Sequence, residues 1–309
     1  MKDLDVLALN TGRVFLDLIF MDAERLPEPG EEVFYDRFAL CPGGSFNTAA
    51  GLARLGLKVA LVEDLGNDPL SDYLVRRIEA EGIAPDLIRR HDREVFSLSV
   101  SMSGKHDRRF ISHVTEMDRP LESIEVLDRF KPRHVNMPGM RLEEDVVRFA
   151  KEAHAKGATV SIECQCQESG SKSPLLPKLI ASADVFFCNG DEARNLTGQS
   201  DVEQGLKELA GLGPLCVVKM GARGAIAQFG ARGKQVHSPA IDVKAIETTG
   251  AGDSFSSGFI FGYLQGSSLE NCLRMGNICG GLSTTAAGGI TAFPTRQKLE
   301  EMMAGSREA

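Results

Sequence analysis

Residues 246–262, IETTGAGDSFSSGFIFG, place small residues and one carboxylate directly before an apolar run. Gly250, Ala251 and Gly252 would let the backbone approach a ligand closely, and the N–H groups of a helix starting there would face an anion. Asp253 falls in the first turn of that predicted helix. A carboxylate beside an anion is useful when it takes a proton from a hydroxyl that attacks the anion. The alternative is that Asp253 only satisfies N–H groups at the helix start.

A second glycine-rich stretch, FALCPGGSFNTAAG at residues 38–51, contains Gly43, Gly44 and Asn47 ahead of a run of small residues. A double glycine lets the backbone lie close to a small polar ligand, and an asparagine just after it can bond to hydroxyl groups. These residues predict a binding site for such a ligand. A turn followed by a helix cap would explain the same pattern without one.

Asn189 and Glu192 follow the apolar run at residues 184–188. They would therefore lie at the carboxyl end of a parallel strand, where open α/β sheets bind their ligands. Glu192 is predicted to hold Mg²⁺ through water, because Mg²⁺ keeps several waters and takes few carboxylates. The alternative is a helix start with the glutamate near its dipole.

Lys219, Gly221 and Gly224 lie in VVKMGARG at residues 217–224, where another strand-like run ends. The pattern is weak when taken alone. It matches neither the Walker A loop nor the dinucleotide-binding fingerprint, because the spacing between strand and helix differs from both.

Short apolar runs alternate with helical patterns along most of the chain, which predicts a mostly parallel, doubly wound α/β sheet with helices on both faces. In residues 70–80 and 141–156 the apolar side chains recur at helical spacing, with charged residues between them. A further helix is predicted after Gly250, with Thr248 or Thr249 as its N-cap region. The strand-like runs are residues 4–9, 58–63, 133–137, 158–162, 184–188 and 215–219.

Residues 31–40 and 94–113 break this alternation and are typical of exposed strands. The second stretch has a Ser-Gly-Lys-His-Asp turn between two alternating runs, which predicts a hairpin. We expect a small β-layer, a lid suited to covering a ligand, inserted at about residues 12–40 and 93–115; simple edge strands are the alternative. Because no linker divides the chain, residues 1–309 are expected to form a single domain.

Composition limits the possible functions of this 309-residue chain. Its net charge of −8 argues against a broad basic surface for nucleic acid or an anionic membrane. No apolar run approaches 18 residues and no signal peptide is indicated, so we expect a cytoplasmic protein. The seven cysteines contain no CxxC pair, which favours buried thiols over a structural zinc site. Glycine is the unusual component, with 32 residues, about ten more than average usage predicts.

Together these stretches resemble the ribokinase-like (PfkB) family of carbohydrate and nucleoside kinases. The resemblance covers essentially the whole chain, and its signature regions are GGSFNTA at residues 43–49 and ETTGAGDSF at residues 247–255. It implies a ribokinase-like fold, in which a central, mostly parallel sheet carries helices on both faces and a small β-sheet lid often forms a dimer interface. It also implies ATP and Mg²⁺ as cofactors, with K⁺ as a candidate third.

The resemblance implies a role for each matching residue. The catalytic residues would be the base, Asp253, and an anion hole made by the N–H groups of Gly250, Ala251 and Gly252. The residues that contact the substrate would be Gly12, Asp17, Gly43, Gly44 and Asn47. The residues that bind the nucleotide would be Asn189, Lys219, Gly221, Gly224, Thr248 and Asn277, with residues 284–290 lining the adenine.

The metal residues implied in the same way are Glu192, for Mg²⁺ through water, and Glu247, near a monovalent cation. Position 247 departs from the family, which usually has Asp there, and the longer side chain puts activation by K⁺ in question. Residues 163–167 read ECQCQ where several subgroups carry Asp-x-Asn-x-Arg. The missing arginine weakens an assignment to acidic sugars.

Three phenylalanines, Phe15, Phe46 and Phe110, are expected near the substrate wall. There they would pack on a sugar face or a nucleobase, unless they are ordinary lid core. The predicted reaction is transfer of a phosphoryl group from MgATP to a hydroxymethyl group of a small sugar. A nucleoside kinase of the adenosine or inosine type is the alternative, and a non-catalytic sensor of sugar or nucleotide is a third. We expect a homodimer through the lid and no nucleic-acid or membrane partner.

Overall fold

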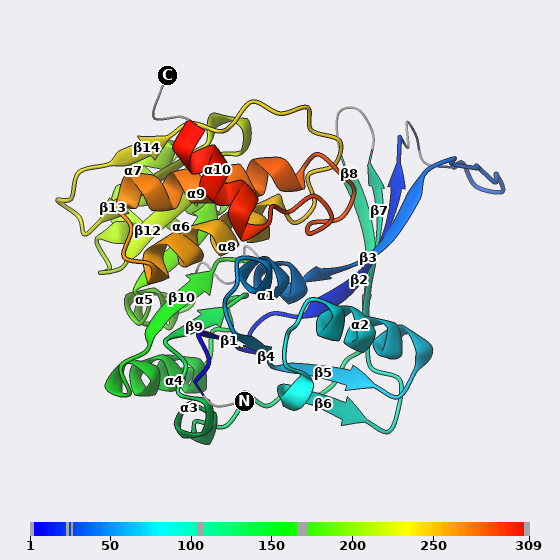
Figure 1. Cartoon of the computed structure of the whole chain (residues 1–309), viewed down its shortest axis with the longest axis horizontal. Helices are drawn as coiled ribbons and strands as arrows, with labels where there is room; N and C mark the ends of the chain where they lie inside the picture. The colour runs from blue at the N-terminus through cyan, green and yellow to red at the C-terminus, as the bar shows by residue number, and fades with distance from the viewer. Residues whose placement is uncertain (1–2, 23–24, 26, 104–107, 166–171, 306–309) are drawn as a thin grey trace.

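The central sheet of the computed structural model has the strand order β14-β13-β12-β11-β10-β9-β1-β4 within the described residues (Figure 1). Pairing is parallel from β4 to β12 and antiparallel at the β12–β13 and β13–β14 edge. The strands are β1 (Val6–Ala8), β4 (Val59–Leu61), β9 (His134–Met137), β10 (Thr159–Glu163), β11 (Val185–Asn189), β12 (Leu215–Lys219), β13 (Ala225–Phe229) and β14 (Val236–Ser238). The described residues are 3–22, 25, 27–103, 108–165 and 172–305.

The mostly parallel, doubly wound architecture predicted from the sequence is confirmed. Each strand-like run of the sequence holds one strand of this sheet, because residues buried on both faces must be apolar almost continuously. Alternate residues of one strand enter two separate cores. In β11, Phe186 belongs to the core on one face, whereas Val185 and Phe187 belong to the core on the other. The antiparallel edge formed by β13 and β14 was not anticipated.

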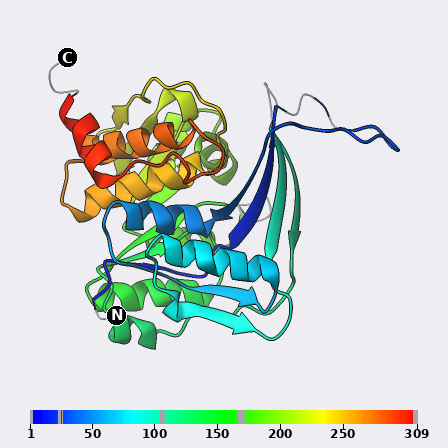
Figure 2. The ribbon, with the colours of Figure 1, turned by 45° about the vertical axis from the view of Figure 1, so that its right-hand side comes forward.

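Helices cover both faces of the sheet (Figures 1 and 2). One core contains side chains of α1, α2, α8, α9 and α10, and the other contains side chains of α3 to α7. The helices predicted over residues 70–80 and 141–156 are α2 and α4. The helices are α1 (Ser45–Arg54), α2 (Pro69–Ala80), α3 (Glu125–Phe130), α4 (Glu144–Ala155), α5 (Leu176–Ala181), α6 (Gly190–Thr197), α7 (Val202–Ala210), α8 (Ala251–Leu264), α9 (Leu269–Ser283) and α10 (Arg296–Gly305), with the short 3₁₀ helices η1 (Pro85–Leu87) and η3 (Gly221–Arg223).

A separate sheet of strand order β3-β2-β7-β8, here called the lid, projects beside α1 and α2 (Figure 2). The predicted hairpin is present as the antiparallel pair β7–β8. Its predicted turn is residues 103–107, of which Ser103 is the last residue of β7 and the other four lie outside the described residues. The lid strands are β2 (Val14–Met21), β3 (Phe38–Gly44), β7 (Ser97–Ser103) and β8 (Arg108–Val114), and a two-stranded sheet below them consists of β5 (Glu63–Gly66) and β6 (Ile88–His91).

The prediction of a strand over residues 31–40 is wrong in its position. Residues 31–37 form no strand, and β3 starts at Phe38 and continues through the double glycine to Gly44. Strand β2 lies inside the lid region predicted at about residues 12–40, but it was not predicted as a separate strand, although it pairs with both β3 and β7. Its sequence, VFLDLIFM, is nearly continuous in apolarity and has little of the alternation that marks a sheet with one exposed face. No helix among the described residues is long and apolar enough to cross a bilayer.

Candidate active site

Several of the predicted site residues come together because parallel strands end at the same edge of a sheet. Glu163, Asn189 and Lys219 are the last residues of β10, β11 and β12, which are neighbours in the sheet. Asn189 lies directly opposite Lys219 in the strand register. The start of helix α8 reaches the same place, since Lys219 Nζ lies 3.4 Å from the carbonyl oxygen of Gly252. This edge is therefore where a ligand could meet side chains from several strands.

Helix α8 begins at a glycine rather than at a threonine. Gly250 is its N-cap, with a left-handed φ of 75°, so the prediction of Thr248 or Thr249 as the cap is wrong. A Cβ at position 250 would lie 2.6 Å from Asn47 Nδ2, which leaves room only for glycine. Thr248 contributes its carbonyl oxygen, which accepts a hydrogen bond of 3.3 Å from Ala251 N.

The N–H groups of Gly252 and Asp253 precede the hydrogen-bond ladder of α8. Its first bond runs from Ser254 N to Gly250 O at 2.9 Å. Donors at this position of a helix have no partner within the helix, and the helix dipole makes the position favourable for an anion. The segment can therefore receive an anionic group, with Ala251 N the donor already engaged by the turn.

Asp253 is held by a side chain from the other end of the chain. Asn47 Nδ2 donates a hydrogen bond of 3.0 Å to Asp253 Oδ2. In the described structure no backbone N–H of the helix start bonds to this carboxylate, so a simple capping role does not account for it. Burial and then the charge of Glu163 raise the pKa of Asp253 to about 6, against the opposing effects of Asn47 and Lys219. A carboxylate with this pKa can accept a proton near neutral pH.

Asp17 lies on lid strand β2, on the face turned toward the same edge. Its side chain is buried, and burial followed by the charges of Asp253 and Glu247 raises its pKa to about 7. A Cβ at position 43 would lie 1.9 Å from Asp17 Oδ2, so Gly43 is the residue type that leaves space for this carboxylate. In the β2–β3 register Gly43 pairs with Phe15, two residues before Asp17 on the same face of β2.

Gly12 and Gly44 place the first loop against the start of α1. A Cβ on Gly12 would lie 2.5 Å from Ser45 Oγ, and one on Gly44 would lie 2.2 Å from Arg13 O. Ser45 N donates to Arg13 O at 2.8 Å. These close approaches bring the first loop, the end of β3 and the helix that carries Asn47 into one assembly.

Glu163 is a member of this cluster that sequence reasoning did not select. Its Oε2 accepts a bond of 2.8 Å from Lys219 Nζ, and both side chains are largely buried. Its other oxygen, Oε1, is buried without a hydrogen-bond partner in the described part of the chain. The signal was present in the sequence, because Glu163 ends an apolar run just as Asn189 does.

Asn189 and Glu192 form a capping box at the start of α6. Glu192 N donates to Asn189 Oδ1 at 2.8 Å, and Asn189 N donates to Glu192 Oε2 at 2.7 Å. Burial raises the pKa of Glu192. Next to them, Gly221 has a φ of 58°, and a Cβ placed on it would meet no atom within 4 Å, whereas Gly224 is pressed against Ser238 O. Gly221 thus presents open backbone at the end of β12.

Asn277 and Glu247 are each engaged by neighbouring chain. The Asn277 amide donates to Ser238 O at 3.0 Å and to Ser238 Oγ at 3.1 Å, so it ties α9 to the end of β14. Glu247 Oε1 accepts bonds from Thr249 N at 2.8 Å and from Thr249 Oγ1 at 2.6 Å. Glu247 N bonds to Thr284 O, which joins this loop to the 284–290 region.

The three phenylalanines have different surroundings. Phe46 is fully buried in the core beneath α1 and α8, so it packs inside the protein rather than on a substrate wall. Phe110 is 51% exposed on lid strand β8. Phe15 is partly buried, and its ring would lie 3.1 Å from a Cβ on Gly44.

Comparison with known proteins extends over the whole fold. A family model for pfkB family carbohydrate kinases matches residues 10–296. A fructokinase of Vibrio alginolyticus is 26% identical over 279 residues, covering 84% of this chain and 90% of that protein. The solved structure of Arabidopsis thaliana ribokinase complexed with ribose and ATP has a TM-score of 0.79 at 22% identity, covering 98% of this chain and 99% of that chain.

A nucleoside kinase of Methanocaldococcus jannaschii, an archaeal member of the ribokinase family, shares the same fold. Its TM-score is 0.78 at 22% identity, covering 99% of this chain and all of that chain. The match of the family model to residues 10–296 includes both signature regions. The chain therefore belongs to the pfkB family of carbohydrate kinases and is a sugar or nucleoside kinase with a ribokinase-like fold.

Proposed function

We propose that this enzyme transfers the γ-phosphoryl group of ATP to a hydroxymethyl group of a small sugar of the ribose or fructose type. The observation that carries the proposal is the placement of Asp253. It combines a position in the first turn of α8, a raised pKa and a fixed orientation on Asn47. A base is needed beside the phosphoryl group at the moment when the attacking hydroxyl loses its proton.

In this mechanism Asp17, Gly12, Gly43, Gly44 and Asn47 bind the hydroxyl groups of the sugar. Asp253 then accepts the proton of the attacking hydroxymethyl group. The N–H groups of Gly250 and Gly252 at the start of α8 stabilise the negative charge that develops on the phosphoryl oxygens. The N–H of Ala251 would join this anion hole by leaving its bond to Thr248 O. The lid excludes water, which would otherwise compete with the sugar for ATP.

Kinases of this family use ATP together with Mg²⁺. The acidic edge of the sheet fits such an ion, because Glu192 is partly exposed and Glu163 keeps one buried oxygen without a partner in the described chain. We propose that Glu192 holds Mg²⁺ through water, and that bound Mg²⁺ supplies neutralising charge to the phosphates. The nucleotide would be bound by Asn189, Lys219, Gly221, Gly224, Thr248 and Asn277.

Glu247 is the proposed neighbour of a monovalent cation. It is buried beside Thr249, and its loop is bonded to Thr284. Comparing turnover in potassium chloride with turnover in N-methyl-glucamine chloride tests this role. Equal rates in the two salts would remove K⁺ from the proposal.

The lid is the proposed contact between two copies of the chain. On the face opposite Asp17, the row Leu40, Leu18, Val100 and Ile111 runs across all four strands, and Ile111 is 66% exposed. Phe38 on the same face is 60% exposed. Apolar side chains gathered on one face in this way favour association with a second apolar surface. We further propose one kinase domain over residues 1–309, acting in the cytoplasm.

The proposal is tested with purified protein, MgATP and coupled detection of ADP on ribose, fructose, adenosine and inosine. Turnover of a sugar well above that of both nucleosides is the expected result. Preferential turnover of adenosine or inosine would instead assign the chain to the nucleoside kinases. Binding of ATP without turnover of any acceptor would favour a non-catalytic sensor.

A further inference from the structure

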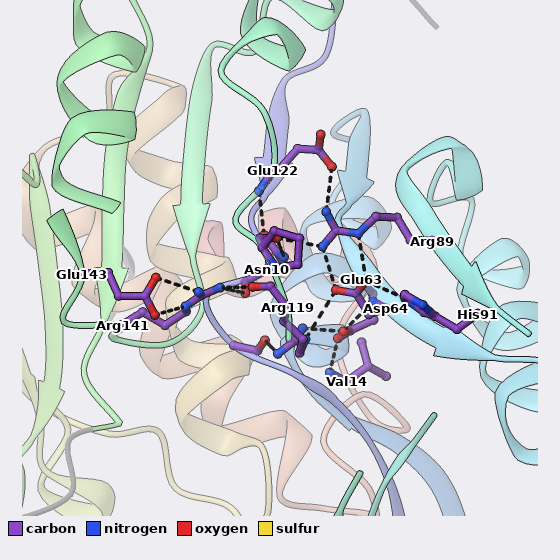
Figure 3. A network of polar contacts seen from close by, with 12 residues as sticks. Asn10, Val14, Glu63, Asp64, Arg89, His91, Arg119, Glu122, Arg141 and Glu143 are labelled. Atoms are coloured by element: carbon purple, nitrogen blue, oxygen red, sulfur yellow. Dashed lines mark hydrogen bonds and ion pairs between the residues drawn. The ribbon is translucent and has the colours of Figure 1, made fainter. Parts of the chain in front are cut away.

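A network of buried charges lies where the lid joins the central sheet (Figure 3). Its members come from the loop after β1, from β5 and β6, and from the segment that follows lid strand β8. Glu63, Asp64 and Arg119 are each less than 10% exposed. None of the sequence motifs includes them, and the mechanism above does not use them.

Arg119 is the centre of the network. Its Nη2 donates to Glu63 Oε1 at 2.5 Å, and its Nη1 donates to the carbonyl oxygen of Gly12 at 3.0 Å. Glu63 Oε2 in turn accepts a bond of 2.5 Å from Val14 N. The guanidinium and the carboxylate therefore bind the same short segment, residues 12–14, one at Gly12 and the other at Val14.

Residues 12–14 lead directly to the proposed substrate-binding residues. Val14 is the first residue of β2, and Asp17 follows three residues later on the same strand. The carbonyl oxygen of Arg13, between Gly12 and Val14, accepts a hydrogen bond of 2.8 Å from Ser45 N. Ser45 is the first residue of α1, and Asn47 follows two residues later. The segment held by Glu63 and Arg119 therefore continues directly into the strand of Asp17 and is bonded to the first residue of the helix that carries Asn47.

The rest of the network fixes the other connections of the lid. Asp64 accepts bonds from Arg89 and His91 on β6, which leads into β7. The carbonyl oxygen of Pro120, after β8, accepts a bond of 2.9 Å from Asn10 Nδ2. Arg89 also donates to this carbonyl at 3.0 Å. The start of β2, the approach to β7 and the exit from β8 are therefore cross-linked at one place.

We propose that Glu63 and Arg119 are positioning residues for phosphoryl transfer. They contact no reacting atom. They hold residues 12–14 so that Asp17 and Asn47 are correctly placed to bind the sugar and Asn47 is correctly placed to orient Asp253. A misplacement of about 1 Å in such groups is enough to reduce a rate by orders of magnitude. The inference rests on the proposed function, because it takes Asp17 and Asn47 as sugar contacts.

The test compares the double variant Glu63→Gln/Arg119→Met with the wild type. The double variant removes both charges together and leaves no unpaired buried ion, which single removal would create. Steady-state kinetics use the member of the ribose, fructose, adenosine and inosine panel that the wild type phosphorylates. We expect kcat/KM for this acceptor to fall at least tenfold while KM for ATP stays within twofold. Arg119→Lys, which retains the charge, should recover part of the loss.

Arg133→Met is the matched control. Arg133 is an exposed arginine that also bonds to a carboxylate and a carbonyl, those of Asp5 and Leu264, but it lies away from the lid. It should leave both kinetic constants unchanged. A double variant with unchanged acceptor kinetics, or one in which KM for ATP rises as much as kcat/KM for the acceptor falls, would overturn the positioning role.

Hydrogen exchange gives a readout that does not depend on turnover. The amides of residues 14–18 should exchange at least tenfold faster in the double variant, whereas those of β9 keep their wild-type rates. Wild-type protein that phosphorylates no acceptor would contradict the proposed function and leave this readout intact. Unchanged exchange at residues 14–18 would show that Glu63 and Arg119 do not hold the segment.

Discussion

Asn47 and Asp253 are joined by a hydrogen bond of 3.0 Å although 206 residues separate them in the chain. Asn47 lies in the first turn of α1 and Asp253 in the first turn of α8, and Gly250 and Gly289 leave the space between them for the amide. One nitrogen of Asn47 orients the carboxylate, while its Oδ1 is buried and has no partner in the described chain. An acceptor in that position can take a hydrogen bond from a sugar hydroxyl.

Asp253→Asn should lower kcat by at least two orders of magnitude with little change in KM. The amide has nearly the shape of the carboxylate but cannot accept the proton, so binding survives and the chemical step does not. Steady-state kinetics on the preferred acceptor measure the effect. A variant that retains more than a tenth of wild-type turnover would exclude Asp253 as the base.

The acidic limb of the pH profile should report the ionisation of Asp253, with activity rising through about pH 6. Glu163→Gln should move this limb to lower pH, because the charge of Glu163 raises the pKa of Asp253. Lys219→Met should move it to higher pH, because the charge of Lys219 lowers that pKa. Profiles of kcat/KM between pH 4.5 and 9 measure both shifts. If both substitutions moved the acidic limb in the same direction, this assignment would be contradicted.

Asp17 should make the folded protein less stable as the pH rises from about 4 to about 7. Its folded pKa of about 7 lies above the usual 3.8, so the folded state keeps a proton that the unfolded chain has lost. Stability is then greatest below the unfolded pKa and falls until the folded pKa is passed. The full shift corresponds to roughly 4 kcal/mol at 1.36 kcal/mol per pKa unit.

Asp17→Asn is the variant that tests this pH dependence. Urea unfolding at pH 5 and pH 8 should show a smaller loss of stability in the variant than in the wild type, and the variant should be the more stable protein at pH 8. Acceptor turnover should fall at the same time, because the carboxylate is a proposed sugar contact. An identical pH dependence in the two proteins would show that Asp17 ionises normally.

Ile111→Glu should separate the two copies of a lid-mediated dimer. The charge would lie at the β8 end of the apolar row on the outer lid face, where desolvating it in an interface is costly. Sedimentation velocity should show a dimer for the wild type and a monomer for the variant. Phe229→Glu places the same charge on an exposed phenylalanine of β13, away from the lid, and should leave the dimer intact. A monomeric wild type would exclude the proposed interface.

Much of this architecture was predictable because local patterns determine it. The apolar run at residues 184–188 indicated a buried strand, and β11 occupies Val185–Asn189. Glycines at 43, 44, 250 and 252 indicated backbone near a ligand, and three of these positions leave no space for a Cβ beside Asp17, Arg13 or Asn47. Signals of this kind come from residues close together in sequence.

What could not be predicted depends on contacts between distant segments. Arg119 meets Glu63 across 56 residues, and Lys219 meets Glu163 across 56 residues as well. A single sequence holds no record of such pairs, since each partner alone is an ordinary charged residue in a loop or at a strand end. The prediction of the N-cap of α8 was wrong for a different reason. Thr248 and Thr249 are strong caps by residue type, but the close approach of Asn47 requires glycine at position 250, and the helix is capped there.

The order of the segments along the chain has a consequence for how the enzyme is made. The lid strands and Asn47 leave the ribosome early, whereas α8 emerges only after β9 to β14 have been synthesised. Contacts over so long a separation form late, because the intervening chain must first be ordered. A nascent chain that ends before residue 250 would carry an apolar lid face and the buried side of α1 with no helix to cover it. Its demand for chaperones should therefore peak just before residues 250–309, about the last fifth of the chain, are synthesised.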